Sequence, residues 1–567
     1  MTDETGAEAA TQSDNTAKPK RRWPWVMIVW SIILLALAIL PKMFIAELEE
    51  ATGQGLDFVG IGSLAAMGLL FLSWFLWVAF FSDWRWWRRV LGATMVASIP
   101  IGFLWLFEPI GGDLNAWRMK RWRTAMPTKV AAGTSTGVDL SVEGDDDFAG
   151  YLGPNQTGVL PGPKIDVARF EQSKILWKKP IGEGWSAFAA RNGFAVTMEQ
   201  RGSDECVTCY EISGGDLKWI YTQKARHDDI MGKIGPRSTP TIHDGKVYAC
   251  GSLGDFVCLN GSDGTVVWKK SLHEILGIER EEVSGRTGEP AFREKHYRLA
   301  WGRSASPLIV DDMVVISGGG PALDTKGNDG EMHTLIAFDQ NTGDIRWKGG
   351  DKMIGYASPS LVQLAGRRQI VITAEADIMS FDPETGETLW TWPRPGQASG
   401  MANTSQLTLV SNNQLLSTKG YPDGGSELLS FKTTDGNIKP NSEWKQNRFL
   451  KTKLTSAMVY DGHAYALTNG FLECVRVDDG KRMWKQRGRF GHGQLLVVGD
   501  KLLLHSEGLD RTAKLYLIEA SPDKYNELGS FETIDGICWN TLCLTGSKLL
   551  VRSDADAACI ELPVVSP

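Results

Sequence analysis

The stretch Ala337-Phe-Asp-Gln-Asn-Thr-Gly-Asp-Ile-Arg-Trp347 decides the fold, because its pattern returns along most of the chain. A hydrophobic strand ends in a small residue, a polar turn closed by glycine follows, and a Trp stands ten positions after the small residue. Regular copies run from Cys209 to Trp219, Cys258 to Trp268, Ser380 to Trp390 and Cys474 to Trp484. A copy from Ser430 to Trp444 carries an insertion, and one from Leu517 to Phe531 is degenerate. Repeats of roughly 40 to 50 residues built from short strands predict a β-propeller.

The two ends of the repeat region predict how the ring closes. Each repeat resolves into four strands, and seven complete sets run from Ser186 to Phe531. Three more strands follow, ending in Ala558–Leu562, whereas Lys174–Lys179 precedes the first set without a partner there. Pairing the two ends completes an eighth blade and removes the exposed sheet edges of an open array. We therefore predict an all-β, eight-bladed propeller closed by its N- and C-terminal strands, with seven blades as the alternative.

The Trp residues of the repeat are predicted to dock each blade against the next. Such a role accounts for a good part of the 22 Trp in the chain. The predicted docking residues are Trp177, Trp219, Trp268, Trp347, Trp390, Trp444 and Trp484.

Most of the cysteines fall at the small position of the repeat. Cys209, Cys258, Cys474 and Cys559 stand where other blades have Ala or Ser, which predicts small buried packing residues. Cys206 and Cys209 lie three apart on a strand and point to opposite faces, so they do not form a metal or redox pair. Disulfides between Cys250 and Cys258, or between Cys538 and Cys543, remain open in an exported domain.

The N-terminal fifth of the chain differs from the repeat region. Three runs are almost free of charge, and they predict three membrane helices: Trp25–Leu40, Val59–Phe81 and Val90–Phe107. The first holds an Ala36-Leu-Ala38 triplet, which leaves a cleaved signal peptide open. The lipid bilayer is thus one predicted partner. The net charge of −7 gives no reason to expect nucleic acid as another.

Basic residues around these runs predict the orientation. Arg21 and Arg22 precede the first run, whereas Arg85, Arg88 and Arg89 lie between the second and third. The N-terminus is therefore expected in the cytoplasm of a bacterium, the helices in its cytoplasmic (inner) membrane, and the propeller on the periplasmic or exported side. A basic run after the third helix, from Arg118 to Arg123, suits a segment lying at the headgroups.

The composition divides the chain into four predicted parts. These are a disordered cytoplasmic tail at 1–22, a membrane anchor at 23–110, an interfacial segment and linker at 111–150, and a PQQ-like β-propeller at 151–567. The linker ends in Gly, Ser and Thr residues and an Asp145–Asp147 run, which is read as solvated rather than as a metal site. No metal ligands are assigned.

The repeat and its eight-blade closure resemble the pyrroloquinoline-quinone (PQQ) type propellers, most closely the bacterial PQQ-binding-like repeat proteins that are grouped by similarity to the assembly lipoprotein BamB. The resemblance covers nearly all of the exported part. Segments that carry it are Tyr151–Gly158, Gly182–Ser186, Gly235–Pro240, Gly491–Gln494 and Ala557–Pro563. This similarity implies the fold, but the group mixes quinone enzymes with non-catalytic scaffolds.

The resemblance is compatible with two functions. Quinone alcohol dehydrogenases of this type hold PQQ with a vicinal Cys-Cys disulfide and a calcium bound by Glu, Asn and Asp, and the chain has no Cys-Cys pair and no matching calcium motif. The favoured hypothesis is therefore a membrane-anchored, non-catalytic propeller that binds a protein partner or a ligand as a scaffold. The alternative is a PQQ-dependent dehydrogenase, with PQQ and calcium as possible cofactors, coupled to membrane quinone; catalytic residues are not assigned.

A binding site is predicted where the loops between blades lead into the innermost strands. Six residues stand immediately before the first strand of their blades: Trp185, Arg237, Arg303, Tyr356, His492 and Trp539. Aromatic rings and arginines around a funnel suit a planar anion or an acidic peptide. The alternative is that several of them only wedge neighbouring blades apart. His492 is the most suggestive, because Gly491 and Gly493 flank it.

The longest insertion runs from Ser271 to Trp301, between the second and third blades. Its charged stretch around Glu274 to Glu282 is expected to be helical. An insertion at this place predicts a lid or a partner-docking element.

Overall fold

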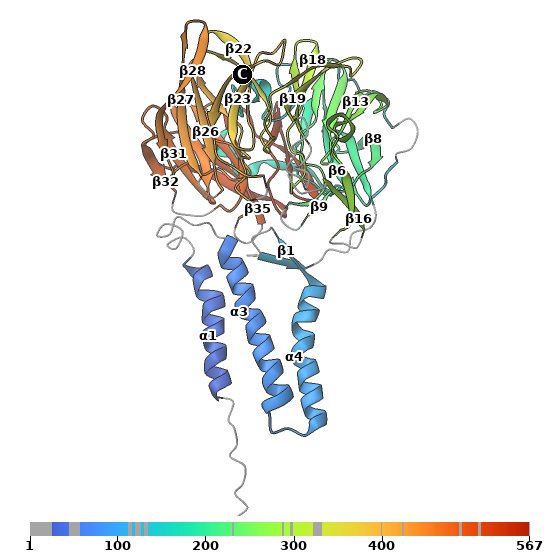
Figure 1. Ribbon diagram of the computed structural model, residues 1–567, viewed down its shortest axis with the longest axis vertical. Helices are drawn as coiled ribbons and strands as arrows, with labels where there is room; N and C mark the ends of the chain where they lie inside the picture. The colour runs from blue at the N-terminus through green and yellow to red at the C-terminus, as the bar shows by residue number, and fades with distance from the viewer. Residues whose placement is uncertain are drawn as a thin grey trace, which may run out of the picture. The chain divides into compact units, whose positions relative to one another are not determined.

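The computed structural model divides the chain into two compact units, one N-terminal and mainly helical, the other almost wholly β (Figure 1). The described residues are 25–44, 57–110, 116–119, 126–129, 134–229, 232–285, 289–294, 299–320, 332–398, 400–421, 424–486, 490–508 and 512–565. The predicted tail at 1–22 lies outside them, as does part of the predicted linker at 111–150.

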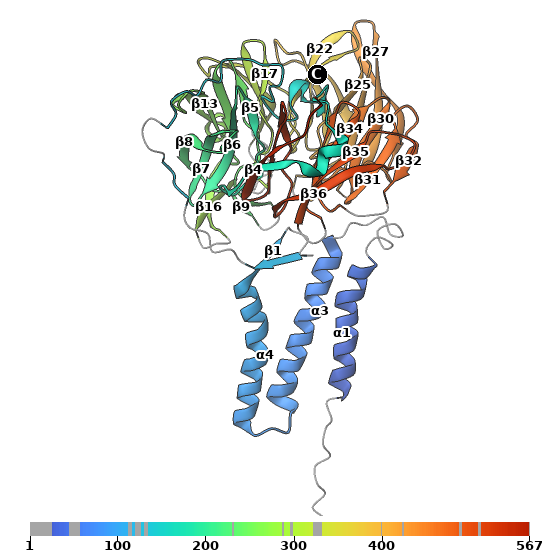
Figure 2. The same ribbon diagram turned by 180° about the vertical axis from the view of Figure 1, so that it is seen from behind.

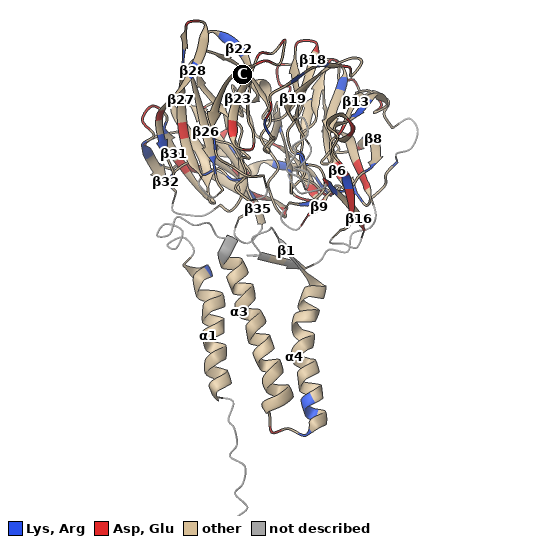
Figure 3. Cartoon of the chain, in the orientation of Figure 1, with Lys and Arg blue, Asp and Glu red and all other residues tan. Residues whose placement is uncertain are grey.

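Three helices of the N-terminal unit are long and apolar enough to cross a membrane. They are α1 (Trp25–Met43), α3 (Asp57–Leu76), which continues into the π-helix η1 (Trp77–Phe81), and α4 (Trp86–Leu106). A short pair of strands follows, β1 (Phe107–Ile110) and β2 (Ala116–Met119). Figure 3 shows helices with very few charged residues, as their hydropathy requires.

Helices α1 and α3 are joined by a reciprocal pair of Trp–Ser hydrogen bonds. The indole of Trp30 donates to Ser73 Oγ at 3.2 Å, and the indole of Trp74 donates to Ser31 Oγ at 2.8 Å. The Ser63 hydroxyl adds a bond to the carbonyl of Ala38 at 2.9 Å. Polar contacts of this kind hold helices together where lipid removes the hydrophobic driving force.

The second unit consists mainly of eight sheets of four or five strands. In chain order, the first four blades contain the strands β5 (Ala189–Arg191), β6 (Phe194–Arg201), β7 (Asp204–Glu211) and β8 (Leu217–Lys224); β11 (Thr241–His243), β12 (Lys246–Cys250), β13 (Asp255–Asn260) and β14 (Val266–Ser271); β17 (Leu308–Val310), β18 (Met313–Gly319), β19 (His333–Asp339) and β20 (Ile345–Gly349); and β21 (Ser360–Leu364), β22 (Arg367–Thr373), β23 (Asp377–Phe381) and β24 (Thr388–Pro393).

The fifth to eighth blades contain β25 (Thr408–Ser411), β26 (Gln414–Lys419), β27 (Gly425–Thr434) and β28 (Asn437–Gln446); β29 (Met458–Tyr460), β30 (His463–Thr468), β31 (Phe471–Arg476) and β32 (Arg482–Lys485); β3 (Val159–Leu160), β33 (Gly493–Val498), β34 (Lys501–Ser506), β35 (Thr512–Glu519) and β36 (Glu527–Asp535); and β37 (Cys543–Thr545), β38 (Lys548–Arg552), β39 (Asp556–Glu561) and β4 (Lys174–Pro180). Short helical turns, η2 (Pro154–Gln156) and η3 (Val167–Gln172), lie on either side of β3.

The eighth blade is closed by the two ends of the propeller, as predicted. Strand β4 pairs antiparallel with β39, and Trp177 lies opposite Cys559. Figure 2 shows β4 beside the strands from the C-terminal end of the chain. The prediction of an eight-bladed propeller is thus confirmed.

The repeat Trp residues reach across the junctions between blades. Six of the seven indoles donate a hydrogen bond to a backbone carbonyl in the turn of the following blade. The turn glycine leaves room for the ring: at Gly343, with φ of +72°, an added Cβ would lie 2.7 Å from the Trp268 ring. Trp390 departs from the rule, because its indole donates at 2.8 Å to Gln369 Oε1 of its own blade. The insertion in the next repeat has replaced the usual turn by the long β27–β28 hairpin.

Apolar clusters fill the spaces between blades. One contains Val247, Val257 and Trp219, and another contains Val315, Leu335 and Trp347. All eight cysteines are buried free thiols, so neither Cys250 with Cys258 nor Cys538 with Cys543 is bonded. Burial raises the pKa of Cys250 and of Cys258 to about 12, which keeps both as unreactive thiols.

The insertion between the second and third blades is mostly not helical, contrary to the prediction. Helix α5 covers only Leu272–Leu276, and the charged stretch after it forms a hairpin of β15 (Arg280–Ser284) and β16 (Pro290–Glu294). Its two strands pair antiparallel from Arg280 opposite Glu294 to Ser284 opposite Pro290. A further short pair, β9 (Asp228–Asp229) and β10 (Lys233–Ile234), lies in the preceding loop.

Candidate functional site

The central channel is lined by a ring of hydroxyl groups at the starts of the innermost strands. These first strands contact one another from blade to blade, but they form no sheet between blades, so their leading N–H groups need other partners. Side-chain hydroxyls of the next blade supply them. The bonds run from Ala187 N to Thr239 Oγ1, from Thr239 N to Ser306 Oγ, from Ser306 N to Ser358 Oγ and from Gln406 N to Ser456 Oγ, at 2.9–3.3 Å.

The segment Tyr151–Leu160 lies close to the fifth, sixth, seventh and eighth blades. Burial raises the pKa of Tyr151, whose hydroxyl lies near Ser456 and Thr541 of two different blades. Gln406 donates to the Gln156 carbonyl at 3.4 Å, and β3 then runs parallel to β33. The segment therefore ties these blades together.

Three of the predicted site residues form one aromatic row at the channel mouth. The rings of Trp185 and Trp539 stack with their centroids 4.5 Å apart, and His492 meets Trp539 edge-on at 6.0 Å. The Trp185 indole donates to the Gly232 carbonyl at 3.0 Å. The buried indole N–H of Trp539, by contrast, has no hydrogen-bond partner. The structure thus brings together residues from the starts of blades seven, eight and one.

A second aromatic group lies at the starts of the third and fourth blades. Tyr356 stacks on Trp301 at 5.0 Å, and Tyr421 lies 5.3 Å from the same indole. Lys453, from the start of the sixth blade, lies 5.1 Å from the centre of the Tyr421 ring. Sequence reasoning missed Trp301, Tyr421 and Lys453, although Trp301 stands two positions before the predicted Arg303.

The two predicted arginines make contacts that hold loops in place. Arg237 donates to the carbonyls of Gly232 and Gly235. Arg303 donates to the Gly318 carbonyl and forms an ion pair of 3.0 Å with Glu294 on the inserted hairpin. Arg303 therefore fastens β16 to the third blade, and its guanidinium is only 2% exposed.

Buried carboxylates brace the loops around the channel mouth. Glu199 accepts bonds from Gly182 N at 2.7 Å, Tyr210 Oη at 2.6 Å and Arg201 Nε at 2.9 Å. Burial acts to raise the pKa of Glu199, but the charges of Arg201 and Arg552 outweigh it and the pKa is lowered. Glu473 accepts from Leu450 N and Thr468, and burial raises its pKa. Each of these carboxylates thus accepts hydrogen bonds from both backbone and side-chain donors of the propeller.

The channel mouth does not fit PQQ and calcium. A planar tricarboxylate needs a flat slot and several cations, whereas Trp185 and Trp539 are in direct contact and Arg303 is already paired. The residues that the structure describes contain no group of three or more His, Cys, Asp or Glu able to hold a metal ion. No step of quinone chemistry can therefore be derived from these side chains.

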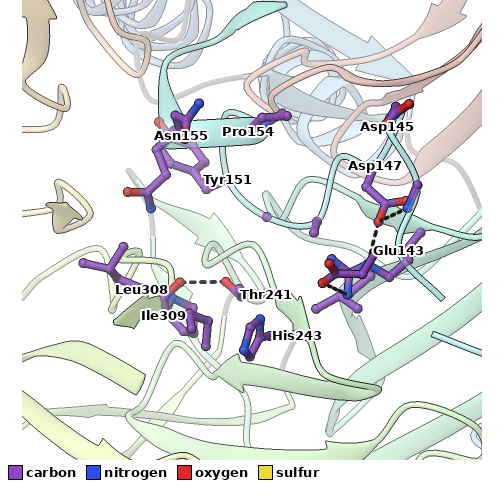
Figure 4. A pocket seen from close by; sticks show the side chains of 18 residues that line it. Glu143, Asp145, Asp147, Tyr151, Pro154, Asn155, Thr241, His243, Leu308 and Ile309 are labelled. Atoms are coloured by element: carbon purple, nitrogen blue, oxygen red, sulfur yellow. Dashed lines mark hydrogen bonds and ion pairs between the residues drawn. The ribbon is translucent and has the colours of Figure 1, made fainter. Parts of the chain in front are cut away.

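A separate cavity of about 420 Å³ lies at the other end of the innermost strands (Figure 4). Arg191 and His243, the last residues of β5 and β11, lie on its wall, with Leu308 and Ile309 beside them. Arg191 pairs with Asp147 at 2.8 Å and with Glu143 at 3.3 Å. Burial and the charge of Arg191 lower the pKa of His243. The predicted linker residue Asp147 is thus part of a structured wall.

The geometry defines an eight-bladed propeller of the PQQ type with a braced channel mouth. Two solved quinohemoprotein alcohol dehydrogenases share this fold. The enzyme from Comamonas testosteroni matches with a TM-score of 0.54 and 11% identity, over 77% of this chain and 85% of that one. The ADHIIG enzyme from Pseudomonas putida HK5 matches with a TM-score of 0.51 and 11% identity, over 76% and 84%.

Sequence comparison narrows the class to one family. The family profile described as outer membrane protein assembly factor BamB matches residues 167–299 and 203–486. The BamB protein of Bordetella pertussis (strain Tohama I) is 30% identical over 361 residues, which cover 59% of this chain and 82% of that protein. The chain belongs to this BamB-like propeller family, as its resemblance implied.

Proposed function

We propose that this protein is a membrane-anchored, non-catalytic propeller that binds another protein of the cell envelope through its channel mouth. The helices α1, α3 and α4 are proposed to hold it in the bacterial inner membrane, with the N-terminus in the cytoplasm and the propeller on the periplasmic or exported side. The membrane anchor at 23–110 and the propeller at 151–567 are then separate in function as well as in structure.

The direct stack of Trp185 on Trp539 carries this proposal. The two rings are in direct contact, which leaves no space for a planar ligand between them. The side chains at the mouth that a partner could contact are those that are partly exposed: His492, Trp539 and Tyr421. Aromatic residues with a nearby cation such as Lys453 are typical of protein interfaces.

The family supports a protein as the partner. The Bordetella pertussis relative is named an assembly factor for outer membrane proteins, so its role is one of association. By analogy, the partner of this chain is proposed to be a component that handles other membrane proteins. The inserted hairpin β15–β16, fixed to the third blade by Arg303, extends the surface available to it.

Photo-crosslinking in intact cells tests this proposal. A crosslinking amino acid would replace Tyr421 or His492 at the mouth, and Asp263 in an exposed turn of the second blade as the control. We expect a discrete crosslinked species from the mouth positions and none from Asp263. Equal labelling from all three positions would contradict a specific interface at the mouth.

The fold shared with quinohemoprotein dehydrogenases favours one alternative, a PQQ-dependent oxidoreductase coupled to membrane quinone. Titration of the full chain with PQQ and calcium, followed by absorbance and thermal stability, separates the two. A ligand present at 100 times its Kd stabilises the native state by about 2.7 kcal/mol. Saturable binding with such a rise in stability would favour the dehydrogenase and justify a screen for substrates; an unchanged unfolding temperature would favour the scaffold.

A further inference from the structure

The connection between α3 and α4 is rich in Trp and Arg. It reads Ser82-Asp-Trp-Arg-Trp-Trp-Arg-Arg89 and contains the turn after η1 and the first residues of α4. The three Trp side chains are exposed by 48% at Trp84, 77% at Trp86 and 45% at Trp87. Figure 3 shows basic residues at this end of α4, on helices that otherwise carry few charges. We call the residues from Trp84 to Arg89 the Trp-Arg patch.

The arginines of the patch share one face of the helix. Arg85, Arg88 and Arg89 have the i, i+3 and i+4 spacing that places side chains next to one another. Arg88 lies 5.0 Å from the centre of the Trp87 ring, and Arg89 Nε donates to the Trp84 carbonyl at 2.9 Å. Among the residues that the structure describes, no carboxylate pairs with any of the three. Asp83 supplies one negative charge nearby without forming an ion pair with a described residue, so the stretch keeps a net positive charge.

The position of these charges on α4 is electrostatically unfavourable. Arg85 is the N-cap residue and gives no side-chain cap, and the first turn of the helix contains no acidic residue. Free N–H groups and the helix dipole already make this end positive, so three arginines add repulsion. An anion supplied from outside would remove that repulsion and would bond with the guanidinium groups in a bidentate manner.

We propose that the Trp-Arg patch binds the phosphodiester headgroups of anionic lipids at the membrane surface. The inference rests on the anchoring part of the proposed function and adds lipid selectivity to it. Trp side chains prefer the headgroup region, which places the neighbouring arginines at the depth of the phosphates. Basic residues close to membrane helices are attracted to anionic lipids by the same charge complementarity.

Lipid binding to the full-length protein in detergent tests the proposal. Native mass spectrometry would count phosphatidylglycerol and phosphatidylcholine molecules bound over a lipid titration. The test variant carries R85Q, R88Q and R89Q. The control carries R346Q, R367Q and R368Q, three exposed propeller arginines, and removes the same charge. A third variant with R85K, R88K and R89K keeps the charge.

We expect the wild type and the control to prefer phosphatidylglycerol. An arginine near an anionic surface contributes about fivefold in affinity, so the Gln variant should bind phosphatidylglycerol roughly 100-fold more weakly. The affinity of the Lys variant for phosphatidylglycerol should fall by less than tenfold. An unaltered charge-state distribution, with an unchanged unfolding temperature of the propeller, confirms that each variant is folded.

Two results would overturn the proposal. One is an affinity for phosphatidylglycerol that changes by less than threefold in the Gln variant. The other is displacement of phosphatidylglycerol by soluble glycerol phosphate at equal concentration, which would assign the patch to a free anion. Carbonate extraction of cell membranes keeps the underlying anchor separate. A chain that resists extraction but shows no lipid preference refutes lipid selectivity alone, whereas a chain released by carbonate refutes the anchor.

Discussion

Removing the Arg552 guanidinium should open the seam where the propeller closes. Arg552 lies at the end of β38 and is 1% exposed. Its Nη1 donates to the Ser186 carbonyl at 3.0 Å, Thr197 Oγ1 at 2.6 Å and the Met198 carbonyl at 2.8 Å. Its Nη2 donates to the Gly182 carbonyl at 3.1 Å. One side chain thus joins the closing blade to the first blade and to the loop after β4.

The loss of stability expected for Arg552→Met follows from these contacts. Burial lowers the pKa of Arg552 to about 10, so it stays charged at neutral pH. A hydrogen bond to a charged group contributes about 1.5–3 kcal/mol, so losing these four bonds should lower the free energy of unfolding by about 3–5 kcal/mol. The methionine refills part of the volume, so little of this cost comes from a cavity.

Hydrogen exchange of the β4 and β39 amides measures the opening of the seam directly. If the free energy of opening at the seam falls by about 3 kcal/mol, the amides there should exchange more than 100-fold faster. The matched control is Arg346→Met, which removes an exposed ion pair with Asp312 at 2.8 Å and should change exchange by less than about fivefold. If Arg552→Met leaves exchange at the seam within threefold of the wild type, Arg552 does not hold the closure.

Three further predictions concern other parts of the molecule. Burial lowers the pKa of His505 to about 3, so the native state loses stability relative to the unfolded chain as the pH falls from about 6.5 towards 3. In urea unfolding at pH 5, His505→Gln should reduce this loss of stability by about 2 kcal/mol, whereas the control His463→Gln should not. Replacing both Ser31 and Ser73 by Ala should weaken the contact of α1 with α3 by about 1 kcal/mol, measured by unfolding in mixed detergent and SDS; an unchanged midpoint would contradict a role for the Trp–Ser bonds. Tyr151→Phe should lower the free energy of unfolding by about 1–2 kcal/mol, and an effect below 0.5 kcal/mol would mean that its hydroxyl does not brace the channel.

The sequence predicts the propeller well because each blade repeats one physical solution. A small strand residue, a turn glycine and a Trp must coincide for the indole to reach the next blade, and that coincidence is visible without coordinates. Trp390 is the exception, and the insertion around Pro440 marks it in the sequence. Closure through β4 also follows from counting strands, since three were left at one end and one at the other.

The candidate site is harder to predict, because position before a strand does not reveal what a side chain touches. Trp185, Trp539 and His492 were chosen by position and do lie together, but Arg303 bonds with Glu294 from a hairpin that looked helical. Glu281 and its neighbours have high helix propensity, and pairing with the other strand of the hairpin outweighs it. Tyr421 was missed because its role depends on contact with Trp301.

Hydroxyl groups connect the innermost strands of neighbouring blades at four of the junctions. Innermost strands that do not pair across blades leave N–H groups at the channel wall, and Thr239, Ser306 and Ser358 satisfy them in sequence. Each hydroxyl accepts one backbone N–H in this way and so connects the innermost strand of one blade to that of the next. The partly exposed rim of His492, Trp539 and Tyr421 is then presented on a support that binding need not deform.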